Sequence, residues 1–267
     1  MSSKRPKAGK KQYFRVMVSK NLSRLVRSLH QKKYRKTENL FLVEGAKSVL
    51  EVIQSRYSVK TLLATPMFLE EHADILSQKP LQLQEASPTE LDALGTLQTN
   101  HTALAVVEMQ PNLPLQAGPG EWALLLEEVG DPGNLGTIIR IADWYGIRKL
   151  ICSPGTVDFY NPKVVTSSKG SFTRVQAYYT ELLPFLEQQR LPVYGADLQG
   201  EPVHSFAFPE GGYLLMGSEA HGISPLVAAK LSGRLTIPAY GQAESLNVAI
   251  ATAIICDNLR RSQPIRP

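Results

Sequence analysis

The chain has 267 residues, of which 43% are hydrophobic and 20% are charged, a composition typical of a globular protein with one large or two modest domains. It contains no run of about 18 apolar residues and begins without the pattern of a secretory signal. Cys152 and Cys256 lack the spacing of metal ligands. We therefore expect a cytoplasmic protein with two reduced, buried thiols, no metal site and no membrane partner.

The charges are distributed unevenly along the chain. The net charge is +5, yet the first 36 residues contain 13 Lys and Arg and no Asp or Glu, which leaves 16 basic and 24 acidic residues for the remainder. A basic arm on an acidic body indicates a polyanionic partner, and nucleic-acid phosphate is the natural one because binding releases counterions. A solubilising tail and an organelle transit peptide are the alternatives.

The first half of the chain predicts an α/β domain. Residues 1–18 form a basic arm that we expect to be flexible, because its first twelve residues have almost nothing to bury. The motif Ser87-Pro88-Thr89-Glu90 combines a capping box with proline at the first helical position. Apolar spacing predicts helices near 22–29 and 46–53 and strands at 41–45, 62–64 and 103–107. These elements indicate a compact domain over residues 19–109.

Residues 110–120 are the best candidate for a linker, because they are rich in proline and glycine and show no apolar period. The apolar run that follows, 122–126, is typical of a strand buried on both faces. Alternating helices and strands over 121–267 then predict a parallel sheet, with later strands at 150–152, 193–196, 213–216 and 235–237. The last helix, 246–259, is apolar around most of its circumference and must be buried, in the core or against a second copy.

Three islands of polar residues and glycine stand at the ends of these apolar strands. They are residues 128–136 with Arg140, residues 217–223, and residues 237–238 leading to 245–247. Strands of a parallel sheet end at the same edge, so the islands predict one small-molecule pocket. The first island lacks both the G-x-G-x-x-G pattern and a Gly-Lys-Ser or Gly-Lys-Thr sequence, which disfavours a nucleotide-binding oxidoreductase and a P-loop protein.

Taken in order, the islands resemble the SpoU (TrmH-like) branch of the SPOUT RNA methyltransferases. The matching motifs are Asn134-x-Gly136 with Arg140, then Gly217-Ser218-Glu219-x-x-Gly222, then Ser245-Leu246-Asn247. The N-terminal half, with residues 41–45, resembles the ribosomal-protein-like RNA-recognition domain often fused to that fold. The resemblance covers the chain from about residue 19.

The resemblance implies an RNA 2′-O-ribose methyltransferase that uses S-adenosylmethionine. It also implies a C-terminal chain threaded into a deep trefoil knot and a pocket completed by a second subunit of a homodimer. Ribosomal RNA is the favoured substrate over transfer RNA, because a separate recognition domain suits a folded local element. Two alternatives stay open: a transfer-RNA methyltransferase of the same family, and a non-catalytic RNA-binding or ribosome-assembly factor, although the latter predicts degraded pocket residues.

Ten site residues follow from the resemblance. The implied cofactor contacts are Leu215, Met216, Gly217, Ile237 and Leu246, and the implied catalytic residues are Arg140, Asn134, Glu219, Ser245 and Asn247. Arg140 matches the family's essential arginine, often described as a general base. Because a guanidinium normally stays protonated, Arg140 could instead grip a phosphate and stabilise negative charge on O2′.

Each candidate also has a purely structural interpretation. Arg140 could pair with Asp143 at i, i+3, Asn134 could be a helix N-cap, and Glu219 could be a solvated turn carboxylate rather than a group that orients Arg140 or the ribose.

Ser245 and Asn247 could cap the last helix. Ala220 departs from the glycine common in the family, and a positive φ angle there would be strained.

Overall fold

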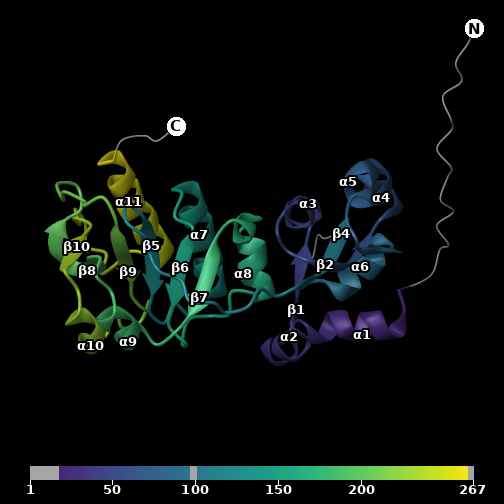
Figure 1. The fold of residues 1–267 in the computed structure, drawn as a ribbon, viewed down its shortest axis with the longest axis horizontal. Helices are drawn as coiled ribbons and strands as arrows, with labels where there is room; N and C mark the ends of the chain where they lie inside the picture. Colours follow the sequence, from purple (N-terminus) through teal and green to yellow (C-terminus); the bar gives the residue numbers. More distant parts are fainter. Residues whose placement is uncertain (1–17, 97–100, 264–267) are drawn as a thin grey trace, which may run out of the picture.

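The computed structural model describes residues 18–96 and 101–263, so that nearly all of the predicted basic arm lies outside the described residues. Two α/β units lie side by side, each with one sheet flanked by helices (Figure 1).

The N-terminal sheet has the strand order β1-β4-β2-β3. Strand β4 is antiparallel to both of its neighbours, and β2 and β3 are parallel. Successive side chains alternate between two apolar layers, one shared with α3 to α5 and the other with α1 and α6. The predicted capping box at Ser87 and Glu90 is present. The elements are α1 (Lys20–Ser28), α2 (Lys32–Glu38), β1 (Leu40–Glu44), α3 (Ala46–Gln54), β2 (Val59–Ala64), α4 (Pro66–Glu71), α5 (Ala73–Ser77), β3 (Gln82–Glu85), α6 (Pro88–Leu94) and β4 (Ala103–Glu108).

The C-terminal sheet is parallel throughout, with the strand order β10-β8-β9-β5-β6-β7. One face packs against α7, α8 and α11, and the other against α9 and α10. The predicted parallel sheet is therefore confirmed. The elements are β5 (Trp122–Leu126), α7 (Pro132–Trp144), β6 (Lys149–Cys152), α8 (Pro162–Ser167), the 3₁₀ turn η1 (Ser171–Thr173), β7 (Gln176–Tyr179), α9 (Leu182–Glu187), β8 (Val193–Pro202), β9 (Gly212–Met216), α10 (Pro225–Ala228), β10 (Gly233–Thr236) and α11 (Val248–Arg261).

Several short elements were not predicted. Helices α8, α9 and α10 and strand β7 span between four and six residues, which is too short for an apolar period to be recognisable. Helix α11 begins at Val248 rather than at Leu246, because the side chain of Asn247 accepts hydrogen bonds from the first turn and so caps the helix.

The two units share a continuous core. Arg35 of α2 lies 2.6 Å from Asp158 in the loop after β6, and both side chains are almost fully buried. Phe41 of β1 and Tyr57, just before β2, make ring contacts with Phe172 of η1. The predicted linker is irregular but anchored, since the backbone N–H of Gln110 donates to the hydroxyl of Tyr160 and that of Ala117 to Tyr213.

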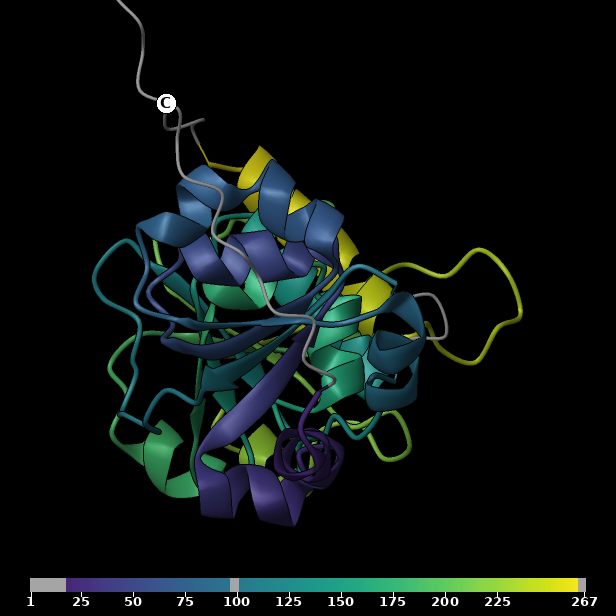
Figure 2. The same cartoon turned by 90° about the vertical axis from the view of Figure 1, so that its right-hand side faces the viewer.

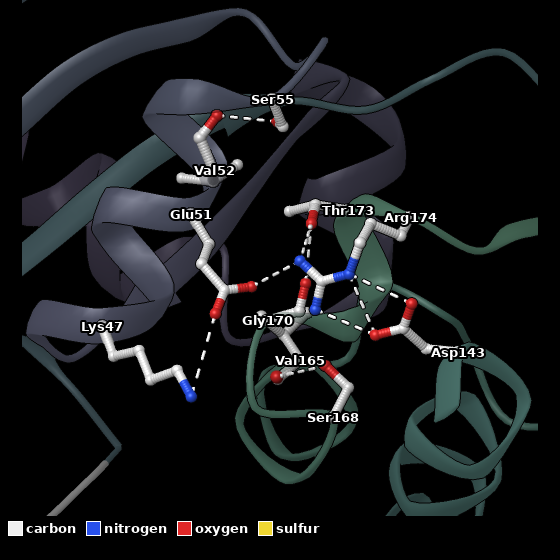
Figure 3. Close-up of polar contacts among 10 residues, drawn as sticks. All are labelled: Lys47, Glu51, Val52, Ser55, Asp143, Val165, Ser168, Gly170, Thr173 and Arg174. Atoms are coloured by element: carbon white, nitrogen blue, oxygen red, sulfur yellow. Dashed lines mark hydrogen bonds and ion pairs between the residues drawn. The ribbon is translucent and has the colours of Figure 1, made fainter. Parts of the chain in front are cut away.

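A second polar contact joins the units near their surface (Figure 3). The guanidinium of Arg174, just after η1, donates to Glu51 of α3 at 2.8 Å and to Asp143 of α7 at 2.9 Å. Asp143 is therefore occupied by Arg174, and the alternative interpretation of Arg140, an i, i+3 pair with Asp143, does not hold. Helix α7, which begins with the first sequence island, is linked in this way to the N-terminal unit.

Candidate active site

The three sequence islands meet in one chain of hydrogen bonds. The side-chain amide of Asn134, in the first turn of α7, donates from Nδ2 to Oε1 of Glu219 at 2.9 Å. Oδ1 of the same side chain accepts from Nδ2 of Asn247 at 2.9 Å. Oδ1 of Asn247 in turn accepts from the backbone N–H of Ala249 at 2.9 Å. The prediction that these distant islands converge is confirmed for Asn134, Glu219 and Asn247, and we call their hydrogen-bond chain the Asn134 relay.

The orientation of both amides in the relay is determined by its ends. An ionised carboxylate can only accept hydrogen bonds, so Asn134 must turn its NH₂ group toward Glu219. A backbone N–H can only donate, so Asn247 must turn its carbonyl oxygen toward α11. The two remaining groups, Oδ1 of Asn134 and Nδ2 of Asn247, then form a complementary pair. Every hydrogen bond in the relay therefore has the same direction: the donors face away from α11 and toward the carboxylate of Glu219.

The second island is held by its own backbone and by a buried carboxylate. Ser218 and Gly222 exchange two backbone hydrogen bonds across the turn, and Gly222 has a φ of 66°, where glycine is unstrained. A Cβ on Gly217 would lie 2.6 Å from the backbone nitrogen of Ile223, so only glycine fits without a shift. Glu127, at the end of β5, accepts from the backbone N–H of Ser224 at 3.0 Å and from its hydroxyl at 2.6 Å.

Glu127 is a site residue that sequence reasoning missed. Glu127 is only 8% exposed, and its side chain ties the far end of the second island to the carboxyl end of β5. The signal was an acidic residue directly after a fully apolar strand, a position where burial demands a hydrogen-bonding partner.

The proposed cofactor contacts surround the same edge of the sheet. Leu215 and Met216 are buried at the end of β9, Ile237 directly follows β10, and Leu246 precedes Asn247. Strands β9 and β10 are both parallel to β8, so they end on the same side. Within the ranges that the structure describes, the backbone groups of Gly217, Ile237 and Leu246 make no hydrogen bond. They are available to bind a polar ligand.

Arg140 and Ser245 are not brought into the relay. Both are exposed, and neither side chain makes a hydrogen bond or ion pair with any residue in the described ranges. Ser245 lies in the segment between β10 and α11, which is exposed from residue 239 to 247 and leads into the yellow helix of Figure 2. Arg140 therefore keeps all its donors free for a ligand.

Two interpretations of the sequence need correction. The N-cap of α7 is Asp131, whose side chain accepts from the backbone N–H of Asn134 at 2.8 Å, so Asn134 itself is not the cap. Glu219 contacts Asn134 and not Arg140. Ala220 does not have a positive φ, so the methyl group is accommodated without backbone strain. Asn247, by contrast, is both a helix cap and a member of the relay.

Comparison with known proteins agrees with this arrangement. Residues 121–257 match the model of the SpoU rRNA Methylase family, and residues 23–105 match that of an MRM3-like substrate binding domain. The chain belongs to the SpoU rRNA methylase family. The predicted fold class and family are thus confirmed, and the SpoU match contains every residue of the Asn134 relay.

Three relatives illustrate the similarity. The chain is 33% identical over 240 residues to RlmP of Bacillus subtilis, a 23S rRNA (guanosine(2553)-2'-O)-methyltransferase, and the match covers 88% of this chain and 94% of RlmP. A TrmH-family structure from Porphyromonas gingivalis is 38% identical, has a TM-score of 0.81 and covers 93% of this chain and 100% of its own. An AdoMet-bound rRNA methyltransferase from Sinorhizobium meliloti is 27% identical with a TM-score of 0.83, and covers 92% and 97%.

The described ranges contain neither a membrane-spanning helix nor a metal-binding cluster. No helix there is both long and apolar enough to cross a bilayer. The same residues contain no group of three or more His, Cys, Asp and Glu side chains that could hold a metal ion.

Proposed function

We propose that this protein transfers a methyl group from S-adenosylmethionine to a ribose 2′-hydroxyl of ribosomal RNA, with 23S rRNA as the first substrate to test. The observation that carries the proposal is the Asn134 relay, because it joins the three SpoU motifs at the carboxyl edge of a parallel sheet, where ligands bind. The match to RlmP over 88% of the chain supports a ribosomal substrate.

S-adenosylmethionine fits the backbone groups at this edge. It supplies an electrophilic methyl group on a sulfonium, and the C–S electron pair leaves with sulfur as the bond to O2′ forms. Gly217, Ile237 and Leu246 offer unpaired amide and carbonyl groups, and Leu215 and Met216 are proposed to contact the cofactor at the end of β9. The close approach of residues 222–223 to Gly217 makes this part of the cradle narrow.

The remaining residues position the RNA and manage charge. The relay holds Asn134 in one orientation, so that its site is organised before substrate arrives. Arg140 is proposed to grip a phosphate and to stabilise the negative charge that develops on O2′ as the hydroxyl proton passes to water. Ser245, on the exposed segment before α11, is proposed to contact the cofactor or the target nucleotide.

A homodimer is part of the proposal. Helices α7 and α11 pack against each other and expose apolar side chains: Trp144 is 83% exposed and Ile250 is 51% exposed, and Leu246, just before α11, is 49% exposed. Trp144 follows Arg140 by one helical turn, so both lie on the same side of α7. A second subunit on this face would cover the apolar groups and enclose Arg140.

Other parts of the proposal rest on the family resemblance. We propose residues 19–109 as the RNA-recognition domain, 110–120 as the connection and 121–267 as the methyltransferase domain. The matches at 23–105 and 121–257 support this division. The trefoil knot stays a prediction, as does the cytoplasmic location, which a ribosomal substrate supports.

Mass-spectrometric mapping of ribose methylation in cells with and without the gene tests the function. We expect one 2′-O-methyl group to disappear from 23S rRNA and to return with the wild-type gene. The Arg140→Ala variant should fail to restore it, with a loss of roughly 10²- to 10³-fold in kcat. Arg148→Ala, an exposed arginine after the end of the same helix, should restore it fully. Loss of a methyl group from transfer RNA instead would identify the alternative substrate.

A further inference from the structure

Helices α1 and α2 carry an unusual concentration of unbalanced charge. Between residues 18 and 37 the sequence has seven Lys and Arg and no Asp or Glu. One of the seven, Arg35, points inward, where it contacts Asp158 and donates to the backbone carbonyls of Leu29 and His30. Its role is structural, because it ties α1, α2 and the C-terminal unit together.

The other six basic side chains point outward. None of them forms an ion pair with a carboxylate in the part of the chain that the structure describes, and all six are exposed; they are Lys20, Arg24, Arg27, Lys32, Lys33 and Lys36. We call these six residues the basic ledge. On the C-terminal unit, by contrast, many basic groups form ion pairs and lie within 3.7 Å of a carboxylate. Examples are Lys149, Lys163, Arg174, Lys230 and Arg234.

The ledge costs the folded protein stability. Lys20 lies in the first turn of α1, and Lys32 and Lys33 lie in the first turn of α2, where the helix dipole disfavours positive charge. Side chains of one sign on adjacent turns also repel each other. A polyanion bound along the ledge removes both penalties.

The ledge lies at the catalytic end of the molecule. Arg35 fastens α2 to Asp158, and the loop that contains Asp158 is bonded to the first SpoU motif, because the backbone N–H of Val157 donates to the carbonyl of Val129 at 3.0 Å. In Figure 1, α1 and α2 run along the lower edge at the level of α9 and α10, which follow the carboxyl ends of β7 and β9.

A groove of about 720 Å³ continues from the ledge between the two units. Lys32 and Lys36 stand at its border with Arg56, and the irregular segment 109–115 forms another wall. Tyr34 is 38% exposed, and the ammonium of Lys33 lies 5.8 Å from its ring centroid. Basic groups beside an exposed aromatic ring suit a nucleic-acid strand, whose phosphates and bases they can contact separately.

We propose that the basic ledge binds the phosphate backbone of the RNA that flanks the target nucleotide, and that Lys32, Lys36 and Arg56 lead this strand into the groove between the units. The proposal rests on the proposed function for the identity of the polyanion. The location of the binding surface follows from the charge and position of the ledge, since unpaired cations at the catalytic end attract RNA phosphates whatever the RNA sequence.

Two double variants test the ledge, Arg24→Ala with Arg27→Ala and Lys33→Ala with Lys36→Ala. Alanine keeps the helices intact, which circular dichroism and the melting temperature would verify. The matched control is Lys79→Ala with Lys230→Ala, which removes the same charge from exposed sites outside the ledge. The probe is a fluorescent transcript of 23S rRNA around guanosine 2553, the nucleotide that RlmP is named for, and the readout is the Kd by anisotropy against KCl concentration.

Each ledge variant should raise the Kd on the order of tenfold near 0.1 M salt and lower the slope of log Kd against log salt by about 1.4 to 1.8, as expected for two lost phosphate contacts. The control should bind like wild type. Ledge variants that match the control in both Kd and slope would overturn the proposal, as would binding that depends only on residues 2–17.

Calorimetric titration with S-adenosylmethionine separates this proposal from the proposed function. The ledge variants should bind S-adenosylmethionine as the wild type does and reach the wild-type kcat at saturating RNA, with only KM raised. If the wild type itself neither binds S-adenosylmethionine nor transfers methyl groups, the proposed function fails, and the anisotropy comparison still decides whether the ledge binds RNA.

Discussion

At the scale of single residues, the side chain of Asn247 has two separable roles, as a helix cap and as a member of the relay. Its Oδ1 caps α11 by accepting from the backbone N–H groups of Ala249 and Ile250, and its Nδ2 donates to Asn134. Glu219 completes the relay at the other end. Because the cap uses only the oxygen and the relay only the nitrogen, one substitution can remove the second task and keep the first.

The variant Asn247→Asp should uncouple these tasks. An Asp caps a helix as well as Asn does, so the melting temperature should stay close to that of wild type. The lost donor breaks the exposed bond to Oδ1 of Asn134, which water can replace, so Asn134 loses its fixed orientation and kcat/KM for methyl transfer should fall by roughly 10- to 100-fold. Asn258→Asp is the control, since Asn258 only donates to Ile254 on the same helix. Full activity of Asn247→Asp would show that the relay does not matter for catalysis.

At the scale of structural elements, the loop formed by the second island is held in place at several points. Two backbone hydrogen bonds close its turn, Glu127 holds its end at Ser224, and residues 222–223 lie directly against Gly217. The position of the loop is therefore set by backbone contacts and by a carboxylate from the neighbouring strand. A side chain at position 217 would push the loop outward.

Gly217→Ala should weaken cofactor binding by at least tenfold in calorimetric titrations, because the new methyl group overlaps the backbone of residues 222–223; overpacking of this kind costs about 1–3 kcal/mol. Gly241→Ala is the matched control in the segment before α11, since a Cβ there has no described atom within 4 Å. Equal affinities for the two variants would contradict the role of the close approach.

At the scale of the whole molecule, a shared core makes the two units one structure. The buried pair of Arg35 and Asp158 crosses the boundary together with the aromatic contacts of Phe41 and Tyr57 on Phe172. The exposed contacts of Arg174 in Figure 3 contribute less to the stability of this boundary, because water and salt screen such pairs.

Arg35→Ala should lower the free energy of unfolding by about 3–5 kcal/mol, because it leaves the Asp158 carboxylate buried without its partner. Arg35→Lys should recover only part of this loss, since an ammonium cannot reproduce the planar set of donors that also serves Leu29 and His30. Urea denaturation measures both changes. Lys33→Ala, exposed in the first turn of the same helix, should raise the free energy of unfolding by less than about 1 kcal/mol, and an equally small change for Arg35→Ala would refute the importance of the buried pair.

The two buried thiols predict how stability changes in alkali. Burial raises the pKa of Cys152 and of Cys256 from 9.0 to about 12. Above pH 9 the unfolded chain releases these protons while the folded chain retains them, so stability is full below pH 9 and is lost as the pH rises toward 12. Each thiol contributes a slope of about 1.4 kcal/mol per pH unit. Urea denaturation between pH 9 and 11 measures this loss. The free energy of unfolding should fall less steeply with pH in the Cys152→Ala, Cys256→Ala double variant than in the wild type. An unchanged pH dependence would show that the buried thiols are not its cause.

Patterns along the chain predicted most of the fold and the convergence of Asn134, Glu219 and Asn247. Apolar periods located the helices near 22–29 and 46–53 and the later parallel strands, because an element of two turns or a full strand repeats its pattern often enough to be recognised. The same reasoning could not find α8, α9 or β7, which are too short. It also could not choose between an Arg140 that is free for a ligand and one that pairs with Asp143, and the structure shows that Asp143 contacts Arg174 instead.

The sequence by itself therefore determined the fold class, the family and the motifs that meet through Asn134, Glu219 and Asn247, since backbone propensities and buried apolar patterns are properties of short segments. Tertiary structure alone decided which side chains meet. Asn134 bonds to Glu219, 85 residues away, and to Asn247, 113 residues away, while Asp143 bonds to Arg174 and leaves Arg140 free. Such pairings depend on where packed strands and helices end in space, and separation along the chain carries no information about that distance.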